Sequence, residues 1–235
     1  YFQCHRGTYT TQAAIKRGNR KSELALREAE IWSIAARNAL AYPAEELDRC
    51  WKNVLVNQFH DILPGSSIAR VYEDARKLYD DVLEHAGQIV SHAQQALTRD
   101  DGVSYFNSLS WTRKALVRTE EGYGFATIPS MGATSSVDRS APEQPVYMRA
   151  EGDAIVMGNG LLEIRLNSRG EMTDCRDAQG IRRIGEKANV LHMYKDVPRK
   201  FDAWDIDSMY PLSPVELDGT SAIEPIENTP WHCAA

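Results

Sequence analysis

The chain has 235 residues, 43% hydrophobic and 26% charged, which is the composition of an ordinary globular protein. Its formal net charge of -6 at pH 7 argues against nucleic acid or an anionic membrane as partner, because both require concentrated Lys and Arg. The longest apolar runs are far shorter than the roughly 20 residues of a membrane-spanning helix, and the first residues do not resemble a secretory signal.

Three segments in the first hundred residues have the helical period, with apolar or small side chains at three- and four-residue steps. They run from 22 to about 41, from 43 to near 60, and from 66 or 67 to 97. Ser22 is a suitable amino-terminal cap, and Pro43 suits the first turn of the second helix. Because the connections are short, the pattern favours an antiparallel three-helix bundle.

The period changes after residue 102. Short runs rich in β-branched and aromatic residues, separated by Gly, Pro, Asn and Ser, predict strands. The predicted strands are 103–107, 114–119, 123–128, 145–149, 154–157 and 161–166. The segment 130–144 has no periodic pattern and is expected to be a mobile loop or a linker, and 167–170 is expected to form a hairpin turn.

The predicted fold class is therefore α+β with more than one domain. We expect a helical domain over 1–101, a first β segment with its loop or linker over 102–144, and an incomplete β-sandwich over 145–235. A sheet that ends with the chain leaves unpaired edge strands, so self-association into a homo-oligomer is possible.

Four cysteines are widely scattered and form no CxxC pair: Cys4, Cys50, Cys175 and Cys233. They favour reduced thiols in a cytoplasmic protein over a disulfide framework. Tyr1-Phe2-Gln3 matches the tail of a protease tag site and also fits a native chain.

One stretch combines an imidazole and a carboxylate at the end of a predicted helix, NQFHD at 57–61. Pro64 and Gly65 must stop the helix, so His60 and Asp61 are expected at its end, where functional groups are often held. A lone histidine on an amphipathic helix is also typical of a buried, hydrogen-bonded side chain. No HxxxH, HExxH or paired CxxC motif supplies further metal ligands, so the residues alone leave both interpretations open.

Five segments resemble, in order, segments of the glycoside hydrolase family 38 α-mannosidases, and are most similar to the bacterial and vacuolar-type branch. They are HRGTYTT at 5–11, NQFHDILPGSS at 57–67, NSLSW at 107–111, NGLLEIRL at 159–166 and FDAWDID at 201–207. The resemblance implies the middle helical domain of that family, followed by the start of a β-sandwich similar to galactose mutarotase.

The resemblance also implies a function. Family members are retaining, metal-dependent enzymes that remove terminal α-linked mannose from oligosaccharides, and the motif histidine binds a metal ion, usually zinc, while the following aspartate contacts mannose hydroxyls. These roles fall on His60 and Asp61. The nucleophile and the acid/base carboxylate belong to an amino-terminal catalytic domain that is expected to precede this chain, so the chain alone is expected to be inactive and to bind zinc weakly. A signal peptide on such a preceding segment stays possible.

Two further residues are weaker candidates for substrate binding. In the resembling family the segment that contains Arg6 and Tyr9 lies near the metal, although such residues at a domain junction more often have packing roles. The acidic-aromatic segment 201–207 could bind sugar, but a structural role in packing is favoured. The alternative function for the whole chain is a non-catalytic carbohydrate-binding or scaffold module.

Overall fold

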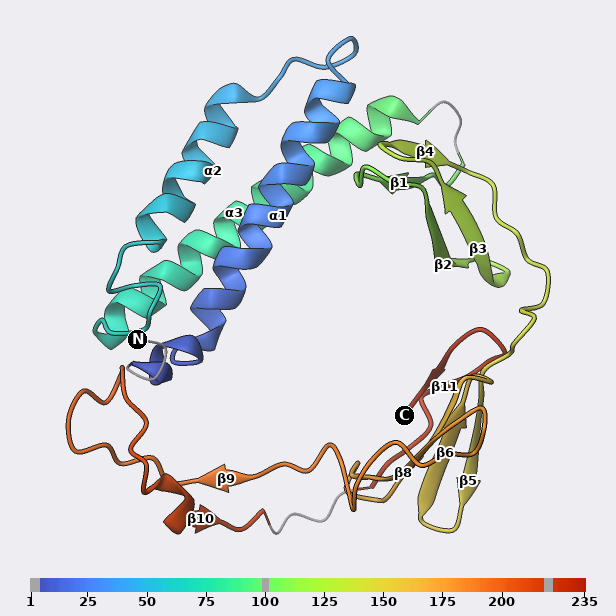
Figure 1. Ribbon diagram of the computed structural model, residues 1–235. Helices are drawn as coiled ribbons and strands as arrows, with labels where there is room; N and C mark the ends of the chain where they lie inside the picture. Colours follow the sequence, from blue (N-terminus) through green and yellow to red (C-terminus); the bar gives the residue numbers. More distant parts are fainter. Residues whose placement is uncertain (1–4, 99–101, 218–221) are drawn as a thin grey trace. The chain divides into compact units, whose positions relative to one another are not determined.

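The computed structural model describes residues 5–98, 102–217 and 222–235. After a short 3-10 turn, η1 (Arg6–Tyr9), the chain forms α1 (Ala13–Ala35), α2 (Ala44–Asn57) and α3 (Ala69–Leu97), which lie along one another in Figure 1. The predicted three-helix bundle and the α+β class are confirmed. Helices α2 and α3 begin close to the predicted positions, where Pro43 is the residue before α2 and Ser66 and Ser67 precede α3.

The first helix differs from the prediction at both ends, because it ends at Ala35 and not near residue 41. It begins nine residues earlier than expected, so Ser22 lies inside α1, fully buried, instead of capping it. The extra turns contain few apolar side chains, but Ile15 is buried against Tyr79 of α3 and Gly18 allows the two helices to approach closely. The apolar pattern of this stretch is weak, so its helical conformation depends on tertiary packing.

The bundle core lies between all three helices. Its largest cluster of buried side chains is Leu26, Ala29, Leu47, Cys50, Val54, Val82 and Ala86. A second cluster joins the start of α1 to α3 and includes Tyr79, where burial, followed by the charge of Glu23, raises the pKa of the phenol to about 12. A salt bridge holds α2 to α3 at the bundle surface, since Arg49 contacts Asp81 at 2.5 Å and Glu46 at 2.6 Å.

We expect Gly18→Ala to destabilise the protein, although alanine is normally the better helix former. A Cβ atom at this position would lie 2.6 Å from Cδ2 and 2.8 Å from Cγ of Tyr79. Overpacking of this kind costs about 1–3 kcal/mol, which exceeds the gain of about 0.8–1 kcal/mol in helix propensity. The free energy of unfolding, measured by urea titration, should fall by about 1 kcal/mol.

Gly87→Ala in α3 is the matched control, because a Cβ atom there would meet nothing within 4 Å. This variant should gain roughly 0.5–1 kcal/mol of stability from helix propensity alone. Equal gains for the two variants would show that α1 and α3 are not in close contact at Gly18.

The remaining strands are short and antiparallel. They are β1 (Tyr105–Asn107), β2 (Arg113–Thr119), β3 (Gly122–Ile128), β4 (Gly132–Thr134), β5 (Tyr147–Glu151), β6 (Ala154–Gly158), β7 (Leu162–Leu166), β8 (Met172–Asp177), β9 (Met193–Tyr194), β10 (Pro214–Val215), β11 (Glu227–Asn228) and β12 (Cys233–Ala234). The largest sheet has the order β5-β6-β7-β8, and among the described residues the others are the pairs β1-β4, β2-β3, β9-β10 and β11-β12. The predicted turn at 167–170 does connect β7 to β8.

One stretch expected to be loop contains a strand. Strand β4 lies within 130–144 and pairs with β1, with Phe106 opposite Ala133. The pairing is only three residues long, so it leaves no periodic pattern in the sequence. Strand β1 in turn contacts the bundle, where Phe106 lies edge-on to the ring of Trp32 with ring centroids 5.1 Å apart.

The chain divides into two compact units. The first comprises Tyr1–Trp111, Pro129–Ser135 and Asp196–Ser213, and the second comprises Thr112–Ile128, Ser136–Lys195 and Pro214–Ala235. The domain boundaries predicted at 101/102 and 144/145 stay predictions. Segment 196–213 belongs with the helices, so everything described next lies within the first unit.

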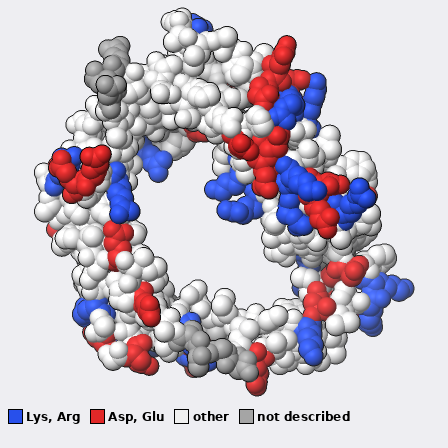
Figure 2. Space-filling view, turned by 180° about the vertical axis from the view of Figure 1, so that it is seen from behind, with Lys and Arg blue, Asp and Glu red and all other residues white. Residues whose placement is uncertain are grey.

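Charged side chains of both signs lie close together on the face shown in Figure 2. No helix among the described residues is long and apolar enough to cross a membrane. Cys50, Cys175 and Cys233 are free thiols, whereas Cys4 and the Tyr1-Phe2-Gln3 segment lie outside the described residues.

Candidate functional site

The NQFHD segment begins in the last turn of α2 and continues into the turn that leads to α3. Its first two side chains anchor it. Asn57 is 1% exposed and donates from Nδ2 to the Ala75 carbonyl of α3 at 3.4 Å. Gln58 donates from Nε2 to Oδ1 of Asn19 in α1 at 2.9 Å. The two amides therefore fix the end of α2 against both neighbouring helices.

His60 and Asp61 follow the helix and face solvent. The side chains are 76% and 46% exposed, and Nε2 of His60 lies 3.4 Å from Oδ2 of Asp61. The imidazole ring also contacts the ring of Phe59, with centroids 4.2 Å apart. The alternative interpretation, in which His60 is a buried core histidine, is therefore wrong, while its role as a metal ligand stays a prediction.

The turn that carries this pair is held by its own Ser66 and by Tyr72 of α3. The hydroxyl of Ser66 donates to Oδ1 of Asp61 at 3.1 Å, which leaves Oδ2 directed toward His60. The hydroxyl oxygen of buried Tyr72 accepts from the backbone N–H of Ser67 at 2.5 Å and donates to the Asp61 carbonyl at 3.4 Å. Both ends of the turn are thus joined through one tyrosine hydroxyl.

The turn is also held by the beginning of α1. Nζ of Lys16 donates to the carbonyl oxygens of Leu63 and Pro64 at 2.9 and 3.2 Å. Gly65 has a φ of 96° and packs so closely on Thr11 that a Cβ atom would lie 2.7 Å from Cγ2 of that threonine. The exposed His60–Asp61 pair therefore sits on a constrained segment.

The exposed imidazole of His60 fits one position of a zinc site. Zinc accepts an imidazole nitrogen at about 2.0–2.1 Å, and the Asp61 carboxylate, 3.4 Å from Nε2 of His60, lies beside that nitrogen. An exposed imidazole nitrogen can bind zinc without displacing any core contact. Within the part of the chain that the structure describes, no group of three His, Cys, Asp or Glu side chains is arranged to hold a metal ion. A complete site would therefore need ligands from elsewhere.

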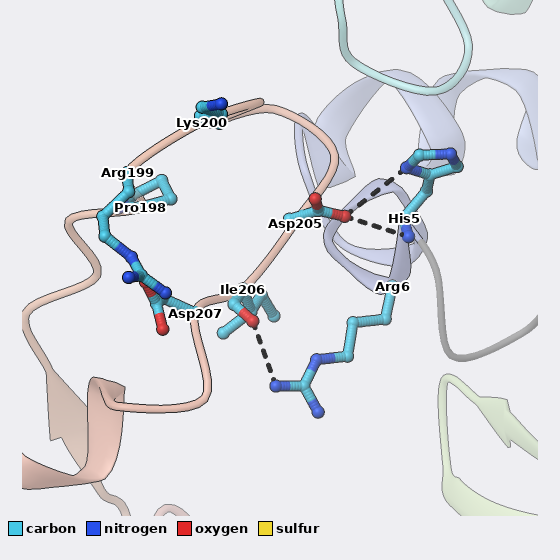
Figure 3. A pocket seen from close by; sticks show the side chains of 8 residues that line it. All are labelled: His5, Arg6, Pro198, Arg199, Lys200, Asp205, Ile206 and Asp207. Carbon is cyan, nitrogen blue, oxygen red and sulfur yellow. Dashed lines mark hydrogen bonds and ion pairs between the residues drawn. The ribbon is translucent and has the colours of Figure 1, made fainter.

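Arg6 lines a different cleft, formed by η1 and segment 198–207 (Figure 3). Its volume is about 620 Å³, and its lining residues are His5, Arg6, Pro198, Arg199, Lys200, Asp205, Ile206 and Asp207. The Arg6 guanidinium group donates to the Ile206 carbonyl at 3.1 Å. The lining includes neither His60 nor Tyr9, which is 53% exposed on η1. The substrate-binding roles of Arg6 and Tyr9 stay predictions.

Segment 201–207 is bound to η1 through the backbone. The N–H of Gly7 donates to the Trp204 carbonyl at 2.8 Å, and a Cβ atom on Gly7 would lie 2.8 Å from that oxygen. The Asp205 carboxylate accepts the His5 N–H at 3.1 Å (Figure 3), and Trp204 is 36% exposed. In the cleft beside this junction, Met209 N–H and Arg199 hold the pKa of the Asp207 carboxyl below its usual range.

Sequence reasoning did not identify the residues that support the motif. Lys16 of α1, Tyr72 of α3 and Thr11, which lies between η1 and α1, reach the turn from elsewhere in the bundle, and the contact from Lys16 to Leu63 spans 47 residues of sequence. Pattern analysis of one helix at a time has no signal for such contacts. The only available hint was Lys16 itself, a polar residue beside the buried Ile15 in a weakly amphipathic stretch.

Comparison with known proteins defines the class of protein. Residues 3–97 match the family described as "Alpha mannosidase middle domain", and residues 157–234 match "Glycosyl hydrolases family 38 C-terminal domain". Together the two matches cover more than half of the chain. The chain therefore belongs to glycoside hydrolase family 38, the α-mannosidases.

Individual relatives agree with this assignment. The chain is 35% identical over 227 residues to "Alpha-mannosidase 2C1" of Mus musculus, covering 88% of this chain and 22% of that protein. It is 30% identical over 226 residues to "Alpha-mannosidase" of Saccharomyces cerevisiae, covering 88% and 19%. It thus spans about a fifth of the length of these curated relatives.

A solved structure supports the fold. An α-mannosidase from Enterococcus faecalis V583 superposes with a TM-score of 0.56 at 14% sequence identity, covering 75% of this chain and 29% of that one.

Proposed function

We propose that the polypeptide to which this chain belongs is a zinc-dependent, retaining α-mannosidase that removes terminal α-linked mannose from oligosaccharides. In this proposal His60 is one metal ligand and Asp61 contacts mannose hydroxyls. The observation that supports it is an exposed imidazole and an exposed carboxylate, held side by side on a constrained turn, in a segment that matches the α-mannosidase middle domain.

Zinc, when bound, supplies a positive centre that can bind sugar hydroxyls and fix the position of the ring. The neutral imidazole of His60 provides a nitrogen lone pair for it. Asp61 accepts hydrogen bonds from mannose hydroxyls through Oδ2, because Oδ1 already accepts from Ser66. The remaining metal ligands and the two carboxyl groups of a retaining glycosidase, which lie about 5–5.5 Å apart, are proposed to come from another segment of the polypeptide.

The proposal is tested by comparing the full-length polypeptide with the 235-residue chain in an aryl α-mannoside assay. The full-length protein should turn over the substrate, lose activity on chelation and regain it when Zn²⁺ is added. The 235-residue chain should show negligible turnover. Turnover by the 235-residue chain alone, or activity that is insensitive to chelation, would contradict the proposal.

Asp61→Asn in the full-length protein should lower kcat/KM roughly 10- to 100-fold. The amide keeps the shape and the Ser66 contact but loses the charge, and a hydrogen bond to a charged group contributes about 1.5–3 kcal/mol. The zinc content should be unchanged, because the metal ligand is His60. Asp48→Asn is the matched control, since Asp48 is exposed on α2 and pairs with Lys52. If Asp61→Asn and Asp48→Asn were equally active, Asp61 would have no substrate contact.

A further inference from the structure

The ammonium group of Lys16 is directed at the turn that carries His60 and Asp61. Nζ donates to three backbone carbonyl oxygens, those of Thr11 at 2.6 Å, Leu63 at 2.9 Å and Pro64 at 3.2 Å. An ammonium group has three N–H donors, so all three are used. Two of the three acceptors lie two and three residues after Asp61.

This arrangement has an electrostatic cost. Burial lowers the pKa of Lys16, because it disfavours the charged form. Among the residues that the structure describes, the hydrogen-bond partners of the ammonium group are backbone carbonyls, and no carboxylate lies within ion-pair distance. Carbonyl dipoles alone offset the loss of hydration. A lysine on the solvent-facing side of a helix normally extends its ammonium group into water, and Lys21 of the same helix is exposed in this way.

Residues on both sides of Lys16 are themselves held by hydrogen bonds and packing. Thr11, which supplies one acceptor, donates its hydroxyl to the Gly7 carbonyl at 2.7 Å and packs against Gly65 of the turn. Ile15, adjacent in sequence, is completely buried in the core of the bundle. Lys16 therefore links the turn to a fixed point of the fold, and its removal leaves two carbonyl oxygens of the turn without this donor.

We propose that Lys16 is a positioning residue for the His60–Asp61 pair. Its ammonium group fastens the turn 58–67 to the beginning of α1 and so sets the position from which the imidazole and the carboxylate meet their ligands. This inference rests on the proposed α-mannosidase function. In this proposal Lys16 contacts neither the metal nor the sugar, but it affects the binding of both through the position of His60 and Asp61.

The test uses three variants of the full-length polypeptide. Lys16→Met keeps the aliphatic length without the donors, Lys16→Arg restores the donors, and Lys21→Met is the control on the exposed face of α1. Amide hydrogen exchange, followed by mass spectrometry, is measured for the turn 58–67 and for the interior of α3. In Lys16→Met exchange in the turn should rise at least about tenfold while α3 stays protected, and Lys16→Arg should restore most of the protection.

Kinetics provide the second measurement. In Lys16→Met kcat/KM for an aryl α-mannoside should fall about 10- to 100-fold, the usual cost of losing a group that orients a ligand, with little change in the melting temperature. Unchanged exchange in the turn, or faster exchange with undiminished kcat/KM, would overturn the inference. If the unsubstituted polypeptide shows no mannosidase activity, the proposed function fails instead, and the exchange measurement tells the two failures apart because it does not depend on activity.

Discussion

His60→Ala in the full-length polypeptide should lower kcat/KM for an aryl α-mannoside by more than about 100-fold and should greatly reduce the bound zinc. Loss of an outer-shell partner of a metal ligand typically costs about 10- to 100-fold, so loss of a ligand should cost more. The stability of the metal-free protein should change little, within about 0.5 kcal/mol, because the ring is 76% exposed and lies outside the core. The measurements are initial rates, metal content by elemental analysis, and urea unfolding.

His92→Ala is the matched control. His92 is an exposed histidine on α3, so the substitution removes an imidazole from the same bundle. This variant should keep its activity and its zinc. A His60→Ala protein that retained both would show that the exposed ring is not a ligand, and the assignment of Asp61 as the mannose contact would lose its main support.

The helices with the clearest apolar stripes were the ones whose bounds the sequence predicted best. In α2 and α3 buried side chains recur at helical spacing, and proline or serine marks the start of each. The beginning of α1 was not predictable, because Gly18 and Lys16 are unfavourable or neutral in an isolated amphipathic pattern. They become favourable only when Tyr79 packs on the first and the turn after α2 accepts hydrogen bonds from the second.

The strands show the same limit. Strands β2, β3, β6 and β7 contain β-branched or aromatic runs long enough to recognise, and the structure places strands there. Strand β4 is three residues long and pairs with β1 across a separation of more than twenty residues. Its conformation depends on that partner, and a short Gly-Ala-Thr segment contains no local signal for it.

Some features of the candidate site follow from the sequence of one segment, and others depend on contacts that only the folded chain makes. The order of Asn57, His60, Asp61 and Pro64 is enough to predict a functional pair at the end of a helix. It is not enough to predict that Tyr72 joins the two ends of the turn or that Lys16 fastens it to α1. These contacts arise because three helices bring their ends together, which the local pattern of one helix does not contain.

Gly65→Ala should be among the most damaging substitutions in the turn. The φ of 96° at this position is strained for any residue with a side chain, at roughly 1–2 kcal/mol. A Cβ atom would also lie 2.7 Å from Cγ2 and 2.9 Å from the carbonyl oxygen of Thr11, and such overpacking costs about 1–3 kcal/mol. The free energy of unfolding should therefore fall by about 2–5 kcal/mol, as measured by urea titration.

Gly170→Ala separates the effect of backbone strain from the effect of overpacking. Gly170 has a φ of 72°, but a Cβ atom there would meet nothing within 4 Å, so only the backbone strain of roughly 1–2 kcal/mol applies. The difference between the two variants reports the contact between Gly65 and Thr11, and an equal loss in both would show that the turn is not packed on the segment before α1. Because His60 and Asp61 are carried by that turn, Gly65→Ala should also lower kcat/KM in the full-length protein, whereas Gly170→Ala should leave it unchanged.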